Sequence, residues 1–324
     1  MQTLLVTGAE GFAGRYLIAH LQQAGYEVVA GVRNRARKLA HERQNGKALV
    51  CDVTDAISVA RVVASVRPDA LVHLAGLARP SDAADEPLEA YQSIVTSWAN
   101  VLDAVRRTVP RAKIVMASAC DVYGDAGSTG QPLREDTPTQ PISTFGSLKR
   151  AAESIAQTFF RDYHLNVTIA RPFHYTGAGQ SERFIYGAIA HRLAENESKS
   201  DFTELWLPDL DCRRDLLHVQ DVAAAYERLL VDGVPNEAYN ICSGQALSLR
   251  EIAGLIAGAF GRQLQLCDLP TPENEVQIAA LQGDNAKLRE LGWSPQHTPQ
   301  DAVRDLVAGY RAAQPVGKPQ TAAV

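Results

Sequence analysis

The sequence lacks three features that would place it in a functional class at once. Its Lys and Arg residues form no long run: the densest group, RNRARK at 33–38, sits in a chain of formal net charge −5, which argues against a nucleic-acid partner. Its five cysteines show no C-x-x-C spacing, so we expect no metal site and no disulfide framework, only reduced, buried thiols. No stretch reaches about 18 uninterrupted apolar residues, the length of a membrane span.

The N-terminal stretch also lacks the basic and apolar regions of a secretion signal. We therefore expect a cytoplasmic protein with no membrane partner. With 324 residues and 46% hydrophobic content, the chain is long enough for a large core and a second lobe. A single core stops growing near about 250–300 residues.

Short apolar runs alternate with helical patterns through the first half of the chain. The runs read TLLVTG, EVVAGV, ALVCDV, ALVHLAG, KIVMAS and LNVTIARP, and helices are expected at 12–24, 55–66, 91–108 and from 144 onward. Strands joined by crossover helices predict an α/β fold, a Rossmann-type doubly wound parallel sheet with a smaller α/β substrate-binding lobe. We assign 1–172 and about 211–240 to the sheet domain, about 173–210 and 241–312 to the lobe, and 313–324 to a tail.

A glycine turn follows the first predicted strand and opens the first helix. In VTGAEGFAG, Gly8, Gly11 and Gly14 have the G-x-x-G-x-x-G spacing. Such glycines let the backbone turn tightly and approach a pyrophosphate, whose charge rests on the helix N-terminus. At this position in a β-α-β-α chain, the spacing predicts dinucleotide binding.

The end of the second strand indicates which dinucleotide binds. An Asp or Glu there would accept a hydrogen bond from the ribose 2′-OH of NAD. The chain has Arg33 and Arg35 instead, which suit a 2′-phosphate, so NADP(H) is favoured and NAD(H) stays possible. The alternative is that Arg33 and Arg35 belong to an ordinary solvated basic loop and bind no phosphate. Asp52 and Val53, after the third strand, lie where the adenine ring would be bracketed.

Several motifs in a fixed order give the chain a resemblance to a known family. TGAEGFAG, HLAG, DVYG, FGSLK, ARPF, RRDLLHVQDVA, YNICSG and LGWSP resemble the extended short-chain dehydrogenase/reductase family of nucleotide-sugar epimerases, dehydratases and reductases. Within it, the chain is most similar to the GDP-4-keto-6-deoxy-D-mannose reductases. The resemblance adds Phe12 and the segment Leu74, Ala75 and Gly76 to the expected cofactor site.

The resemblance also implies a catalytic set from which two hydroxyls are missing. In the family, a Tyr exchanges the proton, a Lys four residues later binds the ribose and lowers the Tyr pKa, and a Ser or Thr bonds the reacting oxygen. Lys149 is present, but Phe145 occupies the Tyr position and Ala119 the Ser/Thr position. Ser118 is one residue away on the other strand face, and Ile94 stands where relatives have Asn.

Four residues are candidate substitutes or neighbours of the missing acid. Cys120 and Asp121 occupy the positions of the acidic pair of dehydratases, and the lack of that pair makes a dehydratase less expected than a reductase or epimerase. Tyr123 is expected to lie beside the substrate and pack rather than react. His174 replaces an Asn of the relatives and is either a proton donor near neutral pH or a hydrogen-bonding contact to the substrate.

The sugar-nucleotide side is expected around Arg214, whose guanidinium suits a diphosphate. Gln180 and Arg183 either add contacts or are solvated loop residues. The resemblance implies a GDP-linked sugar more than a UDP- or dTDP-linked one, and a homodimer. The expected function is an NADP(H)-dependent nucleotide-sugar oxidoreductase, either an inactivated variant or a diverged member of its family. A catalytically silent binding protein and a nucleotide-sugar epimerase are the alternatives.

Overall fold

A computed structural model describes residues 2–44, 46–195, 202–269 and 278–313. Its largest sheet contains β1 (Thr3–Thr7), β2 (Glu27–Val32), β3 (Ala48–Val50), β4 (Ala70–His73), β5 (Lys113–Ala117), β6 (Val167–Pro172) and β10 (Ala238–Ile241). The seven strands are all parallel, in the order β10-β6-β5-β4-β1-β2-β3. The winding direction reverses between β1 and β4, and open α/β sheets bind ligands at such a reversal.

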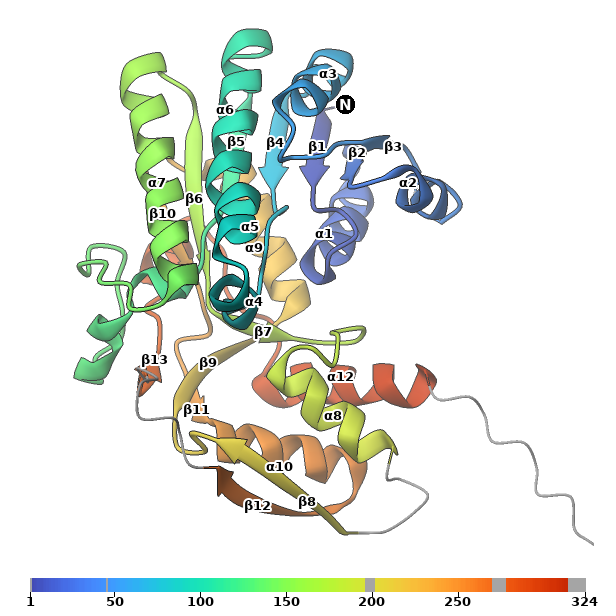
Figure 1. Cartoon of the computed structure of the whole chain (residues 1–324), viewed down its shortest axis with the longest axis vertical. Coiled ribbons are helices and arrows are strands. Elements are labelled where there is room, and N and C mark those ends of the chain that lie inside the picture. The colour runs from blue at the N-terminus through green and yellow to red at the C-terminus, as the bar shows by residue number, and fades with distance from the viewer. Residues whose placement is uncertain (1, 45, 196–201, 270–277, 314–324) are drawn as a thin grey trace, which may run out of the picture.

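Helices cover both faces of this sheet, as Figure 1 shows. One face packs against α3 (Ala56–Val66), α6 (Ser97–Thr108) and α7 (Thr144–Tyr163), and the other against α1 (Phe12–Gln23) and α9 (Val219–Asp232). The remaining helices of this part are α2 (Arg35–Glu42), α4 (Pro80–Asp85) and α5 (Pro87–Tyr91), and a π-helical turn at Gln92–Thr96 leads into α6. The predicted Rossmann-type, doubly wound fold is confirmed.

The sequence at the start of α7 explains why this helix begins where it does. The Ser143 hydroxyl accepts a hydrogen bond from the Gly146 amide at 3.1 Å, which satisfies one free N–H of the first turn. Phe145, Lys149 and Glu153 then recur at four-residue steps and are all buried against the sheet. The helix therefore presents a charged pair, Lys149 and Glu153, to the interior of the protein.

A second group of elements lies beyond the carboxyl ends of the large sheet (Figure 1). Its strands are β7 (His174–Thr176), β8 (Phe202–Pro208), β9 (Arg213–His218), β11 (Ala246–Ser248), β12 (Gln263–Leu269) and β13 (Ala280–Leu281). Strand β9 pairs with β7, β11 and β13, and β8 pairs with β12. One hydrophobic core of this group lies between β8, β9 and three helices, α8 (Ile185–Glu195), α10 (Leu249–Phe260) and α12 (Pro299–Ala313). The short helix α11 (Ala286–Glu290) follows β13 in the chain.

Some elements differ from the sequence expectations. The sequence reading did not predict helices α2, α4, α5 and α12. It also did not predict strands β7, β9, β11, β12 and β13. Cys51, Cys120 and Cys242 are buried free thiols as expected, but Cys212 and Cys267 are half-buried. The expected tail lies outside the described residues except for Ala313, which ends α12.

The domain boundaries stay a prediction. Among the residues that the structure describes, no helix is both long and apolar enough to cross a membrane.

Candidate active site

The glycine turn between β1 and α1 is closed by contacts with the end of β4. Gly8 has a φ of +71°, and a Cβ built there would lie 2.6 Å from the Ala75 amide nitrogen. A Cβ on Gly14 would overlap the Gly8 carbonyl oxygen. Gly11 caps α1 without a side-chain hydrogen bond, so no side chain covers the first N–H groups of the helix. The turn thus forms a cradle that side chains would fill, and it fits a dinucleotide pyrophosphate.

The other expected cofactor residues lie at neighbouring strand ends. Asp52 and Val53 follow β3, where the Asp52 carboxylate accepts hydrogen bonds from the Thr54 amide and hydroxyl at 3.0 and 2.7 Å. The Val53 carbonyl accepts a bond from the Asn100 side chain at 3.0 Å. The Leu74 amide donates to the Thr7 carbonyl at 3.2 Å, which holds the β4 end against the glycine turn.

Phe12 faces the lobe from the first turn of α1. Its ring stacks on Tyr175 with centroids 5.9 Å apart and an interplanar angle of 10°. Because Tyr175 belongs to β7, this stack joins the glycine turn to the second group of strands. Phe12 therefore lies at the boundary between the two parts of the molecule.

The segment after β2 carries the expected arginines. It contacts an acidic residue of the glycine turn, Glu10, which the sequence patterns did not single out. Arg33 and Arg35 are exposed. The Arg33 amide donates to a Glu10 carboxylate oxygen at 3.4 Å, and Arg37 forms an ion pair with the other oxygen at 3.7 Å. The position of Glu10 between the first two glycines of the turn was the one sequence signal that could have pointed to this contact.

Lys149 is held at the end of β5. Its ammonium donates to the Ala117 carbonyl at 2.8 Å and lies 5.6 Å from the centroid of the Phe145 ring. Burial lowers the pKa of Lys149 to about 8, against the opposing effect of the Asp121 and Glu153 carboxylates. Phe145 and Ala119 are both buried. Neither side chain has a hydroxyl to offer to a substrate.

Ile94 is a core residue of the π-helical turn, with 1% of its surface exposed. It offers no polar atom at the position where relatives have Asn. On α6, Asn100 does reach the expected cofactor segment, through its bond to the Val53 carbonyl.

Arg214 lies on β9 within electrostatic reach of several polar groups. Its guanidinium donates to the carbonyls of Arg213 and Ile278, each at 2.9 Å. Burial raises the pKa of the Asp121 carboxyl, while the charges of Arg214 and Lys149 oppose that rise. The Asp121 carboxyl therefore interacts electrostatically with both cations, one from each part of the molecule.

His174 starts β7 and has an unsatisfied nitrogen. Its Nδ1 atom is buried and has no hydrogen-bond partner among the described residues. Burial, with a smaller effect of the Arg214 charge, lowers the pKa of His174 to about 3. Burial therefore favours the neutral imidazole near pH 7, and both expected roles of His174, proton donor and hydrogen-bonding contact, stay predictions.

Tyr123 belongs to a buried polar network. Its hydroxyl donates to the Asn240 side chain at 2.7 Å and accepts a bond from Arg171 at 2.9 Å. Arg171 also forms two bonds to the Glu153 carboxylate, at 2.8 and 2.9 Å, and the Ser118 hydroxyl donates to the same group at 2.6 Å. Burial raises the pKa of Tyr123. The Tyr123 and Ser118 hydroxyls therefore both have protein partners, and the place of Tyr123 beside the substrate stays a prediction.

The two loop residues expected near the diphosphate have protein partners. The Gln180 side chain accepts a bond from the Thr176 hydroxyl at 2.6 Å and donates to the Tyr175 carbonyl at 3.0 Å. Arg183 bonds both carboxylate oxygens of Asp82, on α4, at 3.1 Å. Gln180 therefore braces its own loop, and the Arg183 guanidinium is shared with Asp82.

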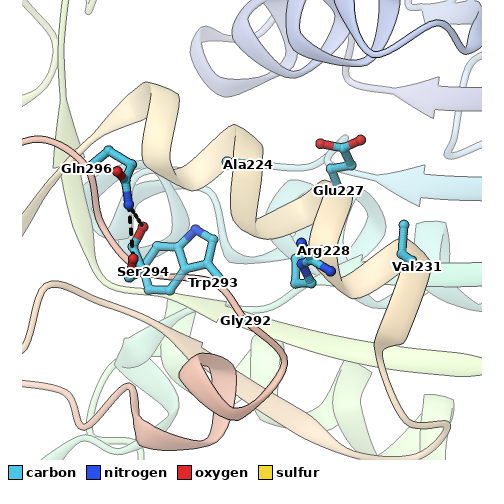
Figure 2. Close-up of a pocket in the computed structure, with 8 residues that line it drawn as sticks. All are labelled: Ala224, Glu227, Arg228, Val231, Gly292, Trp293, Ser294 and Gln296. Carbon is cyan, nitrogen blue, oxygen red and sulfur yellow. Dashed lines mark hydrogen bonds between the residues drawn. The ribbon is translucent and has the colours of Figure 1, made fainter.

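Two hollows in the described surface lie outside this site. The one in Figure 2 has a volume of about 260 Å³ and lies between α9 and the loop that carries Trp293. The second, of about 430 Å³, lies between the edge of the large sheet and α2. Neither hollow shares a lining residue with the candidate site at the ends of β1, β3, β4 and β5. The shape of the surface alone therefore does not identify this site.

Comparisons with known proteins agree with this geometry. A sequence model described as "NAD dependent epimerase/dehydratase family" matches residues 4–242. The chain is 28% identical to GDP-6-deoxy-D-mannose reductase of Pseudomonas aeruginosa over 313 residues, which cover 96% of this chain and 98% of the relative. It is 28% identical to UDP-glucose 4-epimerase of Azospirillum brasilense over 93% of this chain and 89% of the relative. A solved structure described as RMD from Pseudomonas aeruginosa complexed with NADPH superposes with a TM-score of 0.83 at 27% identity and covers 96% of this chain and 99% of the other.

Proposed function

The chain belongs to the NAD dependent epimerase/dehydratase family, and on this premise we propose that it is an NADP(H)-dependent nucleotide-sugar oxidoreductase. The observation that carries the proposal is the position of Lys149. Its ammonium is fixed on the Ala117 carbonyl at the end of β5, a central strand of the sheet whose neighbour β4 closes the glycine turn. A cation there is suited to the ribose of a dinucleotide that spans the strand ends.

The residues divide between cofactor and substrate. Gly8, Gly11 and the N-terminus of α1 hold the pyrophosphate, and Arg33 and Arg35 contact the 2′-phosphate. The remaining cofactor contacts are Phe12, Gly14, Asp52, Val53, Leu74, Ala75 and Gly76. Electrostatic attraction supports this division because the exposed guanidinium groups and the uncovered helix N-terminus are both positive.

The substrate we propose is a GDP-linked 4-keto-6-deoxy-hexose. NADPH supplies a hydride to the keto carbon, a proton adds to the oxygen, and the products are an alcohol and NADP⁺. Arg214 binds the diphosphate, and the neutral His174 offers the hydrogen bond that its unpartnered nitrogen lacks in the protein. The similarity to a GDP-sugar reductase supports the choice of nucleotide and of reaction.

Turnover is expected to be slow because the proton has no good donor. A positioned general acid contributes about 10²–10⁴-fold, and Phe145 has no acidic proton to give. This supports a second candidate, a catalytically silent protein that binds NADP(H) and a nucleotide sugar. An epimerase that retains its nucleotide is the third, supported by the similarity to a UDP-glucose 4-epimerase.

We also propose that the protein is a cytoplasmic homodimer, with α6 and α7 as the contact surface. Tyr163, on α7, is exposed, and the Arg106 guanidinium of α6 lies 4.7 Å from its ring centroid. The two helices thus contact each other through side chains outside the core. Sedimentation of the purified protein measures this state directly.

Two measurements separate the candidates. The melting temperature is recorded with GDP-, UDP- and dTDP-linked sugars, since a ligand at a hundred times its dissociation constant adds about 2.7 kcal/mol of stability. NADPH oxidation is then followed by nicotinamide absorbance with each sugar that binds. Slow oxidation with a GDP-linked keto sugar supports the reductase. Binding without oxidation supports the silent protein, and nucleotide retained through purification supports the epimerase.

A further inference from the structure

Glu10 places a carboxylate against the segment that follows β2. The residue belongs to the glycine turn after β1, and β1 pairs with β2 up to Thr7 and Gly31. One Glu10 oxygen accepts the Arg33 amide at 3.4 Å, and the other lies 3.7 Å from the Arg37 guanidinium. The Glu10 side chain is 22% exposed, so solvent screens its charge only in part.

This is the place where Rossmann folds read the adenosine ribose. A carboxylate at the end of β2 accepts the 2′-OH of NAD in many of them, and this chain has Arg33 there. Glu10 brings a carboxylate to the same segment from the neighbouring turn, beside the pyrophosphate cradle. A ribose bound at this place would therefore have both a cation and an anion beside it.

The other charges around Glu10 leave its carboxylate only partly compensated. Arg37 is 65% exposed, which weakens its ion pair through solvent screening. Lys38 is paired with Glu42 at 3.6 Å, and the buried His41 has its pKa lowered by burial, with Glu10 and Glu42 opposing that effect. A 2′-phosphate would add a charge of about −1.5 to −2 next to Glu10.

We propose that Glu10 determines how strongly the protein discriminates between NADP(H) and NAD(H). Its carboxylate accepts the ribose 2′-OH of NAD(H) and repels the 2′-phosphate of NADP(H). Arg33 and Arg35 still favour NADP(H), but by less than they would without Glu10. The inference rests on the proposed function, because it assumes that a nicotinamide dinucleotide binds in the glycine cradle.

The test is the substitution Glu10→Gln, which keeps the shape of the side chain and removes its charge. Calorimetric titration should show NADPH affinity raised by about fivefold to tenfold at low ionic strength and NADH affinity not raised. The gain should shrink as salt is added. Glu10→Ala carries the same expectation and serves if the amide variant folds poorly.

Glu42→Gln is the matched control, since it removes a carboxylate from α2 that contacts Lys38 and not Arg33. It should leave the ratio of the two affinities unchanged. If Glu10→Gln leaves that ratio unchanged or moves it toward NADH while both cofactors bind, this inference is wrong and the proposed function stands. If the parent protein binds neither cofactor, both are wrong.

Discussion

The ammonium of Lys149 lies 5.6 Å from the centroid of the Phe145 ring, one helical turn away on α7. Under the proposed function, this ring occupies the place of a proton-donating Tyr, but it has no hydroxyl to acidify. The two side chains make a cation–π contact instead, and the ammonium is bonded to the Ala117 carbonyl. If the proposed function holds, α7 keeps the lysine of the proton-transfer pair and lacks the acid.

Restoring both hydroxyls should restore turnover. In the double variant Phe145→Tyr and Ala119→Ser, the Lys149 charge would lower the pKa of the new phenol, and the new serine would supply the second hydrogen bond. We expect a gain of at least ~10²-fold in NADPH oxidation with a GDP-linked 4-keto-6-deoxy sugar, compared with the parent. Fast turnover by the parent would show that another group donates the proton. An inactive double variant would favour the silent binding protein.

The two exposed arginines after β2 should set the affinity for NADPH. Arg33→Ala combined with Arg35→Ala should weaken NADPH binding by about tenfold or more and change NADH binding little, because only NADPH has the 2′-phosphate. Calorimetry with each cofactor measures both effects. Arg43→Ala, at the far end of α2, is the control. Equal losses for the two cofactors would mean that the arginines support the fold of the segment.

Arg214 should act on the sugar nucleotide alone. Hydrogen bonds to charged groups are worth about 1.5–3 kcal/mol, so Arg214→Ala should weaken nucleotide-sugar binding by about 10- to 100-fold. NADPH affinity should stay nearly constant because the cofactor cradle lies on β1 and β4. Arg183→Ala, which breaks the exposed ion pair with Asp82, should have the smaller effect. A matched loss of both ligands after Arg214→Ala would assign Arg214 to the fold.

The buried Lys149 should make stability depend on pH. Its pKa is about 8 in the folded protein and 10.5 ordinarily, so between these values the unfolded state binds more protons than the folded state. Stability from this group therefore rises with pH across that window. Lys149→Met removes the titration, and the unfolding free energy of the parent relative to the variant should increase from about pH 8 to about pH 10. Urea unfolding measures it, and a constant difference would show an unshifted pKa.

The buried pair of Arg171 and Glu153 should be costly to break on one side. Their side chains are 6% and 0% exposed, so Arg171→Met leaves an uncompensated carboxylate in the interior. We expect a loss of about 3–5 kcal/mol in urea unfolding. Adding Glu153→Leu should recover much of that loss because the carboxylate that Arg171 no longer compensates is then removed. If the double variant is as unstable as Arg171→Met, the packing and not the charge stabilises this region.

Local patterns in the sequence determine the sheet, the glycine turn and α7. The spacing of Gly8 and Gly14 is typical of a tight strand-to-helix turn. The four-residue step from Phe145 to Lys149 places both residues on one face of a helix. These predictions depend on residues close together in the chain. Propensity and periodicity act over that range, so the sequence alone was sufficient for them.

The tertiary structure decided the environment of each side chain. Glu10 meets Arg33, Tyr123 meets Arg171, and Arg183 meets Asp82 only because strands and loops distant in sequence are brought together. The low pKa of His174 likewise depends on burial under elements that the sequence pattern does not position. Desolvation and Coulomb interactions act through space, so residue identity alone could name these groups but not assign their charge state or partners.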